Sequence, residues 1–218
     1  MIPPKTLRAA EAHLAAVDPV MARLIAAHGP STLGRKRRDP FHVLCTSIIG
    51  QQLSTKAADT IQGRVAKLLD AVDTAFTHHH FGRVEHEALR ACGLSNAKAK
   101  WLLELAARAG DGRFDPVALA KLENTALAMA LDALPGIGPW TAEMMLIFAF
   151  DRLDVFSLGD VGLRNSINAL YSKRGRDGKF KPLDEKKTLK IVAPWAPYRS
   201  VGCWYLWKQL DGPVDTWA

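Results

Sequence analysis

The chain has 218 residues, of which 48% are apolar, so it is long enough to bury a core as one large domain or two small lobes. Disorder is therefore not expected. The 29 Lys and Arg exceed the 22 Asp and Glu and give a formal charge of +7, which favours a polyanionic partner such as nucleic acid, although solvated lysines alone produce the same balance.

The pattern of cysteines and the lengths of the apolar runs indicate the cellular location of the protein. Cys45, Cys92 and Cys203 are odd in number, far apart and embedded in apolar stretches, which is typical of reduced, buried thiols rather than disulfides. No apolar run approaches the roughly 20 residues that span a bilayer, and the N-terminus lacks a signal-peptide core. We expect a soluble, cytoplasmic protein that is not exported and is nucleoid-associated if the source is bacterial.

Apolar residues recur at helical spacing almost everywhere, which predicts an all-α fold. Asp18-Pro19, Asp39-Pro40 and Asp115-Pro116 each place a capping side chain before a proline in the first helical turn, so they mark three helix starts. The predicted helices lie near residues 5–17, 19–28, 40–50, 55–72, 84–91, 96–109, 116–122, 125–133, 139–150, 161–172, 185–193 and 198–210.

Two predicted loops are strongly basic: residues 34–38 (Gly-Arg-Lys-Arg-Arg) and residues 173–179 (Lys-Arg-Gly-Arg-Asp-Gly-Lys). Either loop can grip phosphates, and either can equally be a solvated charge cluster. A third feature, the triplet His78-His79-His80, has consecutive rather than spaced ligands. We therefore expect no functional metal at the triplet.

The stretch 131–150, LDALPGIGPWTAEMMLIFAF, contains two apolar helices joined by a tight turn, Pro135-Gly136-Ile137-Gly138. Both glycines can adopt backbone angles closed to other residues, and they leave the turn's N–H groups uncovered beside a helix N-terminus. Such a turn can bind DNA phosphates without reading the base sequence. An ordinary helix–helix connector has the same appearance.

Asp160 opens another predicted helix, within DVFSLGDVGLRNSINALY. Its side chain is expected to cap that helix. The positive end of the helix dipole also favours an ionised carboxylate, the state needed to stabilise a developing cation or accept a proton from water. Asp151 and Asp154 are rival carboxylates, but they resemble solvated or capping groups, so Asp160 is the candidate catalytic group.

These segments resemble a known family. LPGIGPWTAEMM followed by DVFSLGDVGLRNSI is similar to the helix-hairpin-helix motif and downstream aspartate of the DNA-3-methyladenine glycosylase II family, within the helix-hairpin-helix (HhH-GPD) superfamily of DNA glycosylases. The resemblance continues in SIIGQQLSTKAA, GLSNAKAKWLLELA and PWAPYRSVGCWYLW. It covers about residues 40–210.

The resemblance implies a role for each matching residue. Asp160 corresponds to the catalytic carboxylate, and Gln52 or Leu53 to the side chain that fills the gap left by a flipped nucleotide. The base pocket would include Trp140, Met144 and Trp207, although core packing is the ordinary role of a tryptophan. The remaining implied contacts are DNA binding by Pro135, Gly136, Ile137 and Gly138, and a structural Na⁺ or K⁺ on the main-chain carbonyls of Asp132, Leu134 and Ile137.

The chain differs from other branches of the family at several positions, and these differences narrow the class of glycosylase that the resemblance implies. Relatives that also cut the strand carry a lysine two residues after the hairpin's last glycine, where this chain has Trp140, so no lyase activity is expected. An iron-sulfur cluster needs four closely spaced cysteines near the C-terminus, where only Cys203 lies. Met144 in place of an aromatic residue and Gly159 in place of an acidic one leave the preferred lesion open.

The predicted protein is a compact form without an N-terminal β domain. The expected lobes comprise about residues 40–155, and 1–39 with 156–218, with the active-site cleft between them. The predicted function is a monomeric, cofactor-independent glycosylase that flips alkylated bases (3-methyladenine or 7-methylguanine type) out of damaged double-stranded DNA. The alternatives are a non-catalytic helix-hairpin-helix DNA-binding module, a glycosylase for another lesion, and an unrelated helical bundle.

Overall fold

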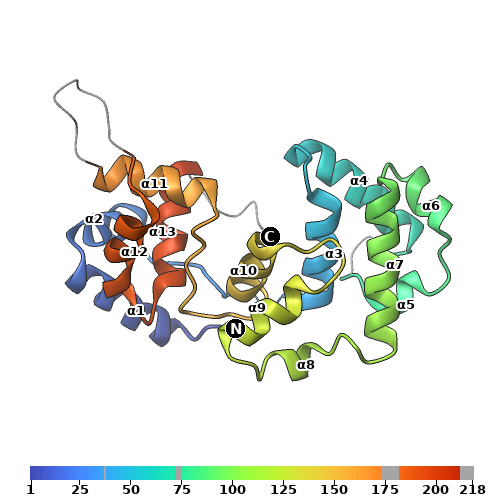
Figure 1. Ribbon diagram of the computed structural model, residues 1–218, viewed down its shortest axis with the longest axis horizontal. Coiled ribbons are helices and arrows are strands. Elements are labelled where there is room, and N and C mark those ends of the chain that lie inside the picture. Colours follow the sequence, from blue (N-terminus) through green and yellow to red (C-terminus); the bar gives the residue numbers. More distant parts are fainter. Residues whose placement is uncertain (37, 72–74, 173–181, 212–218) are drawn as a thin grey trace. The chain divides into compact units, whose positions relative to one another are not determined.

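The computed structural model describes residues 1–36, 38–71, 75–172 and 182–211, and these residues form helices and no strand (Figure 1). The fold is all-α, as predicted. The helices are α1 (Pro4–Val17), α2 (Pro19–His28), α3 (Pro40–Gly50), α4 (Thr55–Leu68), α5 (His78–Phe81), α6 (His86–Ala91), α7 (Asn96–Gly110), α8 (Pro116–Leu119), α9 (Asn124–Asp132), α10 (Pro139–Phe148), α11 (Val161–Tyr171), α12 (Glu185–Val192), the 3₁₀ helix η1 (Ala193–Trp195) and α13 (Arg199–Asp211).

The three predicted Asp-Pro starts are confirmed. Asp18 accepts hydrogen bonds from the N–H groups of Val20 and Met21, Asp39 from that of His42, and Asp115 from that of Val117. Each carboxylate thus satisfies an N–H group that has no partner inside the first turn.

Helix ends were predicted less well. The helix expected over 55–72 stops at Leu68, because Asp70 adopts a left-handed conformation (φ 52°) and the N–H of Ala71 bonds back to the carbonyl of Ala66 at 2.8 Å. This is a Schellman ending with aspartate where glycine is usual. The two short elements α5 and η1, of four and three residues, have no counterpart among the predicted helices.

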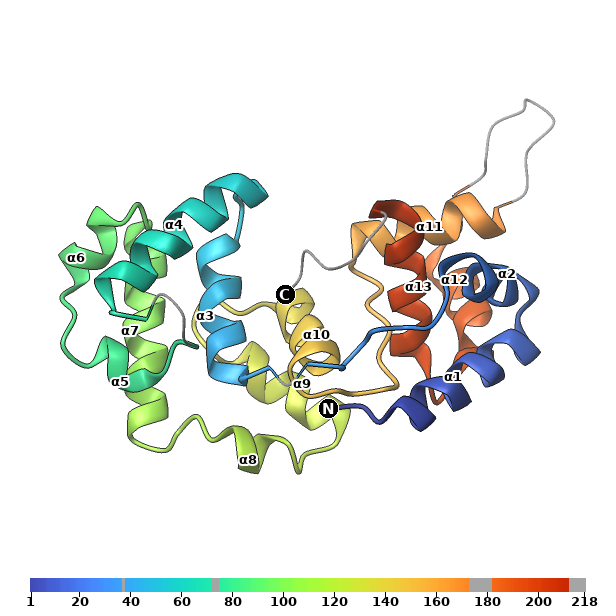
Figure 2. The same ribbon diagram turned by 180° about the vertical axis from the view of Figure 1, so that it is seen from behind.

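Backbone contacts divide the chain into two compact units, Met1–Arg37 with Asp151–Ala218, and Arg38–Phe150. In the first unit α13 packs against both α2 and α11 (Figure 2). The buried carboxylate of Asp18 joins three of this unit's elements, because its Oδ2 accepts hydrogen bonds from the Tyr171 hydroxyl (2.7 Å) and the Trp195 indole (2.9 Å).

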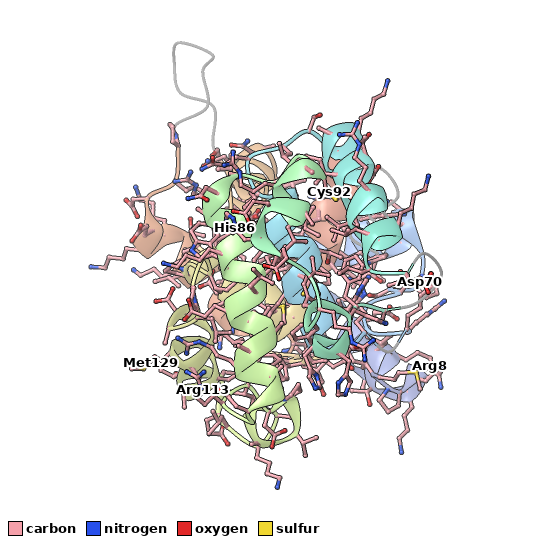
Figure 3. All side chains as sticks on the ribbon, turned by 90° about the vertical axis from the view of Figure 1, so that its right-hand side faces the viewer. Arg8, Asp70, His86, Cys92, Arg113 and Met129 are labelled. Atoms are coloured by element: carbon pink, nitrogen blue, oxygen red, sulfur yellow. The ribbon has the colours of Figure 1, made fainter. Side chains whose placement is uncertain are left out.

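In the second unit α7 packs against α3, α5 and α6. Figure 3 faces this helix, which runs between the labelled His86, beside its start, and Arg113, just beyond its end. Its buried face carries Ala99, Leu102, Leu105 and Ala106. Helix α3 also packs on α4 and α10, and α10 packs on α9.

The structure also bears on several smaller predictions made from the sequence. All three cysteines are buried, free thiols, as predicted. Within the described ranges, no helix is both long and apolar enough to cross a membrane. The basic loop 173–179 lies outside the described residues, as does Arg37 of the other basic loop.

Candidate functional site

Asp160 lies in the first unit as the N-cap of α11. Its side chain is buried, with 7% relative exposure, and its Oδ1 accepts hydrogen bonds from the Leu163 N–H at 2.7 Å and from Nε1 of Trp207 at 3.1 Å. The expected capping role is therefore confirmed. The second contact comes from α13, so two helices fix the orientation of this carboxylate.

Gly162 makes room for this pair. A Cβ at this position would lie 3.1 Å from Oδ1 of Asp160 and 3.5 Å from Cδ1 of Trp207. The closer distance is tighter than ordinary van der Waals contact, so a larger residue would press on the carboxylate. Gly159, in contrast, has open space around its missing Cβ, so the fold itself does not exclude an acidic side chain there.

The rival carboxylates have structural partners. Asp154 forms a two-pronged ion pair with Arg199, at 2.6 and 2.8 Å, and also accepts a bond from the Arg199 backbone N–H at the start of α13. The hydrogen bond from this guanidinium lowers the pKa of Asp154 below its ordinary value. Asp151 pairs with the amino group of Met1 at 2.7 Å. These contacts fit the capping and solvated roles expected for the two residues.

The hairpin lies in the second unit between α9 and α10. Gly136 has φ of 77°, and a Cβ there would lie 2.3 Å from the Trp101 ring, so both the backbone angle and the space require glycine. For Gly138 the expectation of an unusual backbone angle is wrong. Its φ of −108° and ψ of 176° are open to any residue, and its missing Cβ instead leaves empty space at the start of α10.

The other predicted residues of the second unit differ in exposure. Trp140, in the first turn of α10, is 39% exposed, whereas Met144, one turn further along, is 7% exposed. Gln52 and Leu53 are exposed on the turn that follows α3. Trp140, Gln52 and Leu53 therefore offer surface to a ligand, while Met144 lies mainly in the core.

Three contacts of the second unit were not foreseen from the sequence. The Gln51 side chain donates to the Gly136 carbonyl at 2.7 Å, Lys98 donates to two carbonyls at the end of α3, and Trp101 packs beneath Gly136. Gln51 and Lys98 lie inside the motifs SIIGQQLS and GLSNAKAK, but nothing in either motif indicates that they meet.

The histidine triplet forms α5, where it serves the local fold. Nδ1 of His80 accepts a hydrogen bond from the Thr77 N–H at 3.0 Å, which closes a capping box. Across the described part of the chain, no group of three or more His, Cys, Asp or Glu could hold a metal ion. That search does not bear on main-chain carbonyls.

The predicted site thus falls into two groups. Asp160 and Trp207 meet within the first unit, and the hairpin, Trp140, Met144, Gln52 and Leu53 belong to the second. The first unit contains a fixed, buried carboxylate, and the second contains a glycine turn beside a helix N-terminus, the kind of surface that can bind an anion.

Comparison with known proteins identifies the family of the chain. Residues 45–194 match the model of the HhH-GPD superfamily base excision DNA repair proteins. The chain belongs to this superfamily.

Individual relatives narrow the class further. The DNA-3-methyladenine glycosylase 1 of Schizosaccharomyces pombe is 31% identical over 207 residues, which cover 93% of this chain and 87% of the relative. A crystal structure of DNA-3-methyladenine glycosidase from Bacillus halodurans matches with a TM-score of 0.77 and 37% identity, covering 92% of this chain and 88% of that one. The S. pombe 3-methyladenine DNA glycosylase in complex with abasic DNA matches with a TM-score of 0.75 and 31% identity, covering 91% and 95%.

Proposed function

We propose that the protein is a monofunctional DNA glycosylase that hydrolyses the N-glycosidic bond of alkylated bases, of the 3-methyladenine and 7-methylguanine type. The relatives named as 3-methyladenine glycosylases support the reaction class. The observation that carries the mechanism is the buried Asp160 carboxylate, whose orientation is fixed by N–H donors from two helices.

The chemistry explains why one carboxylate is sufficient. A base alkylated on a ring nitrogen is cationic and already a good leaving group, so its departure needs little general-acid assistance. The sugar left behind develops oxocarbenium character, and a negative charge held close to it lowers the barrier. Asp160 supplies that charge and can also orient the attacking water.

The target base must leave the duplex before this step. Flipping costs a few kcal/mol, least for a damaged pair, so it contributes to selection. In our proposal Gln52 or Leu53 fills the vacated space, and the exposed indole of Trp140 stacks on the electron-poor base. The N–H groups of Gly136 and Gly138 bind the phosphate backbone, because Pro135 has no N–H group and that of Ile137 donates to the Leu134 carbonyl.

The hairpin also suits the monovalent cation that the family implies. Its proposed ligands, the carbonyls of Asp132, Leu134 and Ile137, are neutral oxygens, the donor type that Na⁺ and K⁺ accept. The Leu134 carbonyl accepts the Ile137 N–H at 3.1 Å and retains a second lone pair for a metal ion. A bound cation would help to neutralise a DNA phosphate.

Finer features of the proposal follow from the sequence. With Trp140 in the lyase lysine's position, no amine is available there to form a Schiff base with the sugar. Cys203 is the only cysteine after Cys92, so an iron-sulfur cluster is not proposed. We also retain the monomeric state and the cytoplasmic location as proposals.

The test is product analysis on DNA with a defined alkylated base, without added metal or nucleotide. The proposal predicts release of the free methylated base and an unbroken abasic strand. Strand cleavage with borohydride trapping of the enzyme would contradict the monofunctional mechanism. Tight DNA binding without any base release, across a panel of lesions, would support a non-catalytic binding module instead.

A further inference from the structure

The exposed turn after α3 has a conformation that its sequence does not favour. Residues 50–53 form a β-turn closed by the Leu53 N–H on the Gly50 carbonyl at 3.2 Å, with φ −50° and ψ 132° at Gln51 and φ 58° at Gln52. These angles define a type II turn, whose third position normally holds glycine or asparagine. Glutamine there is strained, so other contacts must hold the turn.

The side chain of Lys98 supplies such a contact. Its Nζ donates hydrogen bonds to the carbonyls of Ile49 at 2.9 Å and Gln51 at 2.6 Å. Both carbonyls lie at the C-terminal end of α3, where a cation is favourable. The Gln51 carbonyl belongs to the central peptide of the turn, and rotation of that peptide by about 180° would convert type II into type I. The ammonium group therefore opposes this rotation.

The same turn is tied to the hairpin. The Gln51 side chain donates to the carbonyl of Gly136, and the ring of Trp101 packs beneath that glycine. Lys98 and Trp101 are three residues apart on α7, so they share one face of this helix. One helix face thus supports both the turn and the hairpin, and Gln51 connects the two.

We propose that Lys98 is a positioning residue that sets the aim of Gln52 and Leu53 before DNA binds, by holding the turn in its type II form against the hairpin. This inference rests on the proposed function, in which those two side chains fill the gap left by a flipped nucleotide. The preset turn lowers the ordering cost at the moment of flipping. Loss of the ammonium group would weaken binding to DNA that carries a gap more than binding to intact DNA.

The experiment compares Lys98→Met with Lys100→Met, which removes an exposed lysine from the same helix. Affinity is measured for a duplex containing a tetrahydrofuran abasic site and for the intact duplex of the same sequence. We expect Lys98→Met to reduce the preference for the abasic duplex about tenfold, the effect of a lost charge-assisted hydrogen bond. Lys100→Met should leave that preference unchanged, because a lost phosphate contact weakens both duplexes alike.

A crystal structure of Lys98→Met is the second measurement. We expect the Gln51 carbonyl to rotate and φ of Gln52 to become negative. A turn that keeps positive φ at Gln52, or a preference equal to that of Lys100→Met, would overturn the inference. If Lys98→Met does not fold, Lys98→Leu, which also lacks a donor, replaces it under the same criteria. Wild-type release of methylated base is assayed in parallel, so failure of the proposed function is recognised separately from failure of the inference.

Discussion

At the scale of single residues, the contact between Trp207 and Asp160 is the most informative. The family resemblance implies that Trp207 lines the base pocket, whereas its indole N–H donates directly to the candidate catalytic carboxylate at 3.1 Å. With only 5% relative exposure, the ring is mainly a packed side chain. We therefore expect Trp207 to contribute to catalysis by orienting Asp160, in addition to any contact that it makes with the base.

Trp207→Phe tests that contribution. The change keeps an aromatic ring but removes the N–H donor, so the carboxylate loses the hydrogen bond that comes from α13. We expect the single-turnover rate of base release to fall about tenfold, with DNA affinity largely retained. Trp204→Phe, on the same helix, is the matched control for loss of an indole. Equal rates in the two variants would mean that the hydrogen bond to Asp160 has no catalytic role.

The ion pair between Asp154 and Arg199 makes a prediction about acid stability. The pKa of Asp154 is depressed by its hydrogen bonds to the guanidinium, so the carboxylate stabilises the fold above the unfolded-state pKa of about 4. That contribution disappears as the pH falls through the lower pKa of the folded state. Asp154→Asn should therefore lower the free energy of unfolding at neutral pH and reduce its loss in acid. Parallel urea-derived stability curves for wild type and variant would contradict this account.

At the scale of elements, the hairpin depends on one of its two glycines for folding. Gly136 combines a left-handed backbone angle with close contact to Trp101, whereas Gly138 has an ordinary angle and open space. The two positions consequently have different physical requirements, although they appear equivalent in the sequence.

Alanine substitutions separate these requirements. Gly136→Ala must either displace Trp101 or break the turn, and we expect it to lower the free energy of unfolding by about 3 kcal/mol. Gly138→Ala should cost less than about 1 kcal/mol, because only an N-cap preference is lost. Denaturant unfolding measures both values. Equal destabilisation by the two changes would show that the space around these glycines is assigned incorrectly.

The elements also show where sequence-based prediction succeeds. Helix starts at Asp18, Asp39, Asp115 and Asp160 were found because a capping side chain and its helix are neighbours in sequence. The end of α4 was not found, because aspartate occupies the left-handed position at residue 70 and leaves no glycine signal. A helix boundary can therefore be predicted from the sequence where the residue at the cap is the usual one. It is missed where an unusual residue occupies the cap, as Asp70 does.

Contacts between distant residues were beyond such prediction. Gln51 and Gly136 are separated by 85 residues, and Lys98 meets Gln51 across 47. The family motifs identified the segments that carry these residues but not their pairing. The position of Asp160 as a helix cap could be predicted, because it follows from local sequence, whereas its catalytic role is implied by the resemblance and stays a proposal.

At the scale of the whole molecule, the two compact units have complementary tasks in the function that we propose. The first unit holds Asp160 between α11 and α13, and the second holds the glycine turn and the exposed side chains of Trp140, Gln52 and Leu53. Membership of the HhH-GPD superfamily relates both units to a single base excision repair activity. The central claim is that Asp160 performs the chemical step and the second unit binds the DNA.

Single-turnover release of methylated base by Asp160→Asn tests this claim most directly, with DNA affinity measured in parallel and Asp154→Asn as the matched control. The account predicts that Asp160→Asn loses at least about a hundredfold in rate, as expected when charge stabilisation of a transition state is removed, while its DNA affinity stays near that of wild type. Asp154→Asn should retain its rate. Undiminished base release by Asp160→Asn would contradict the account.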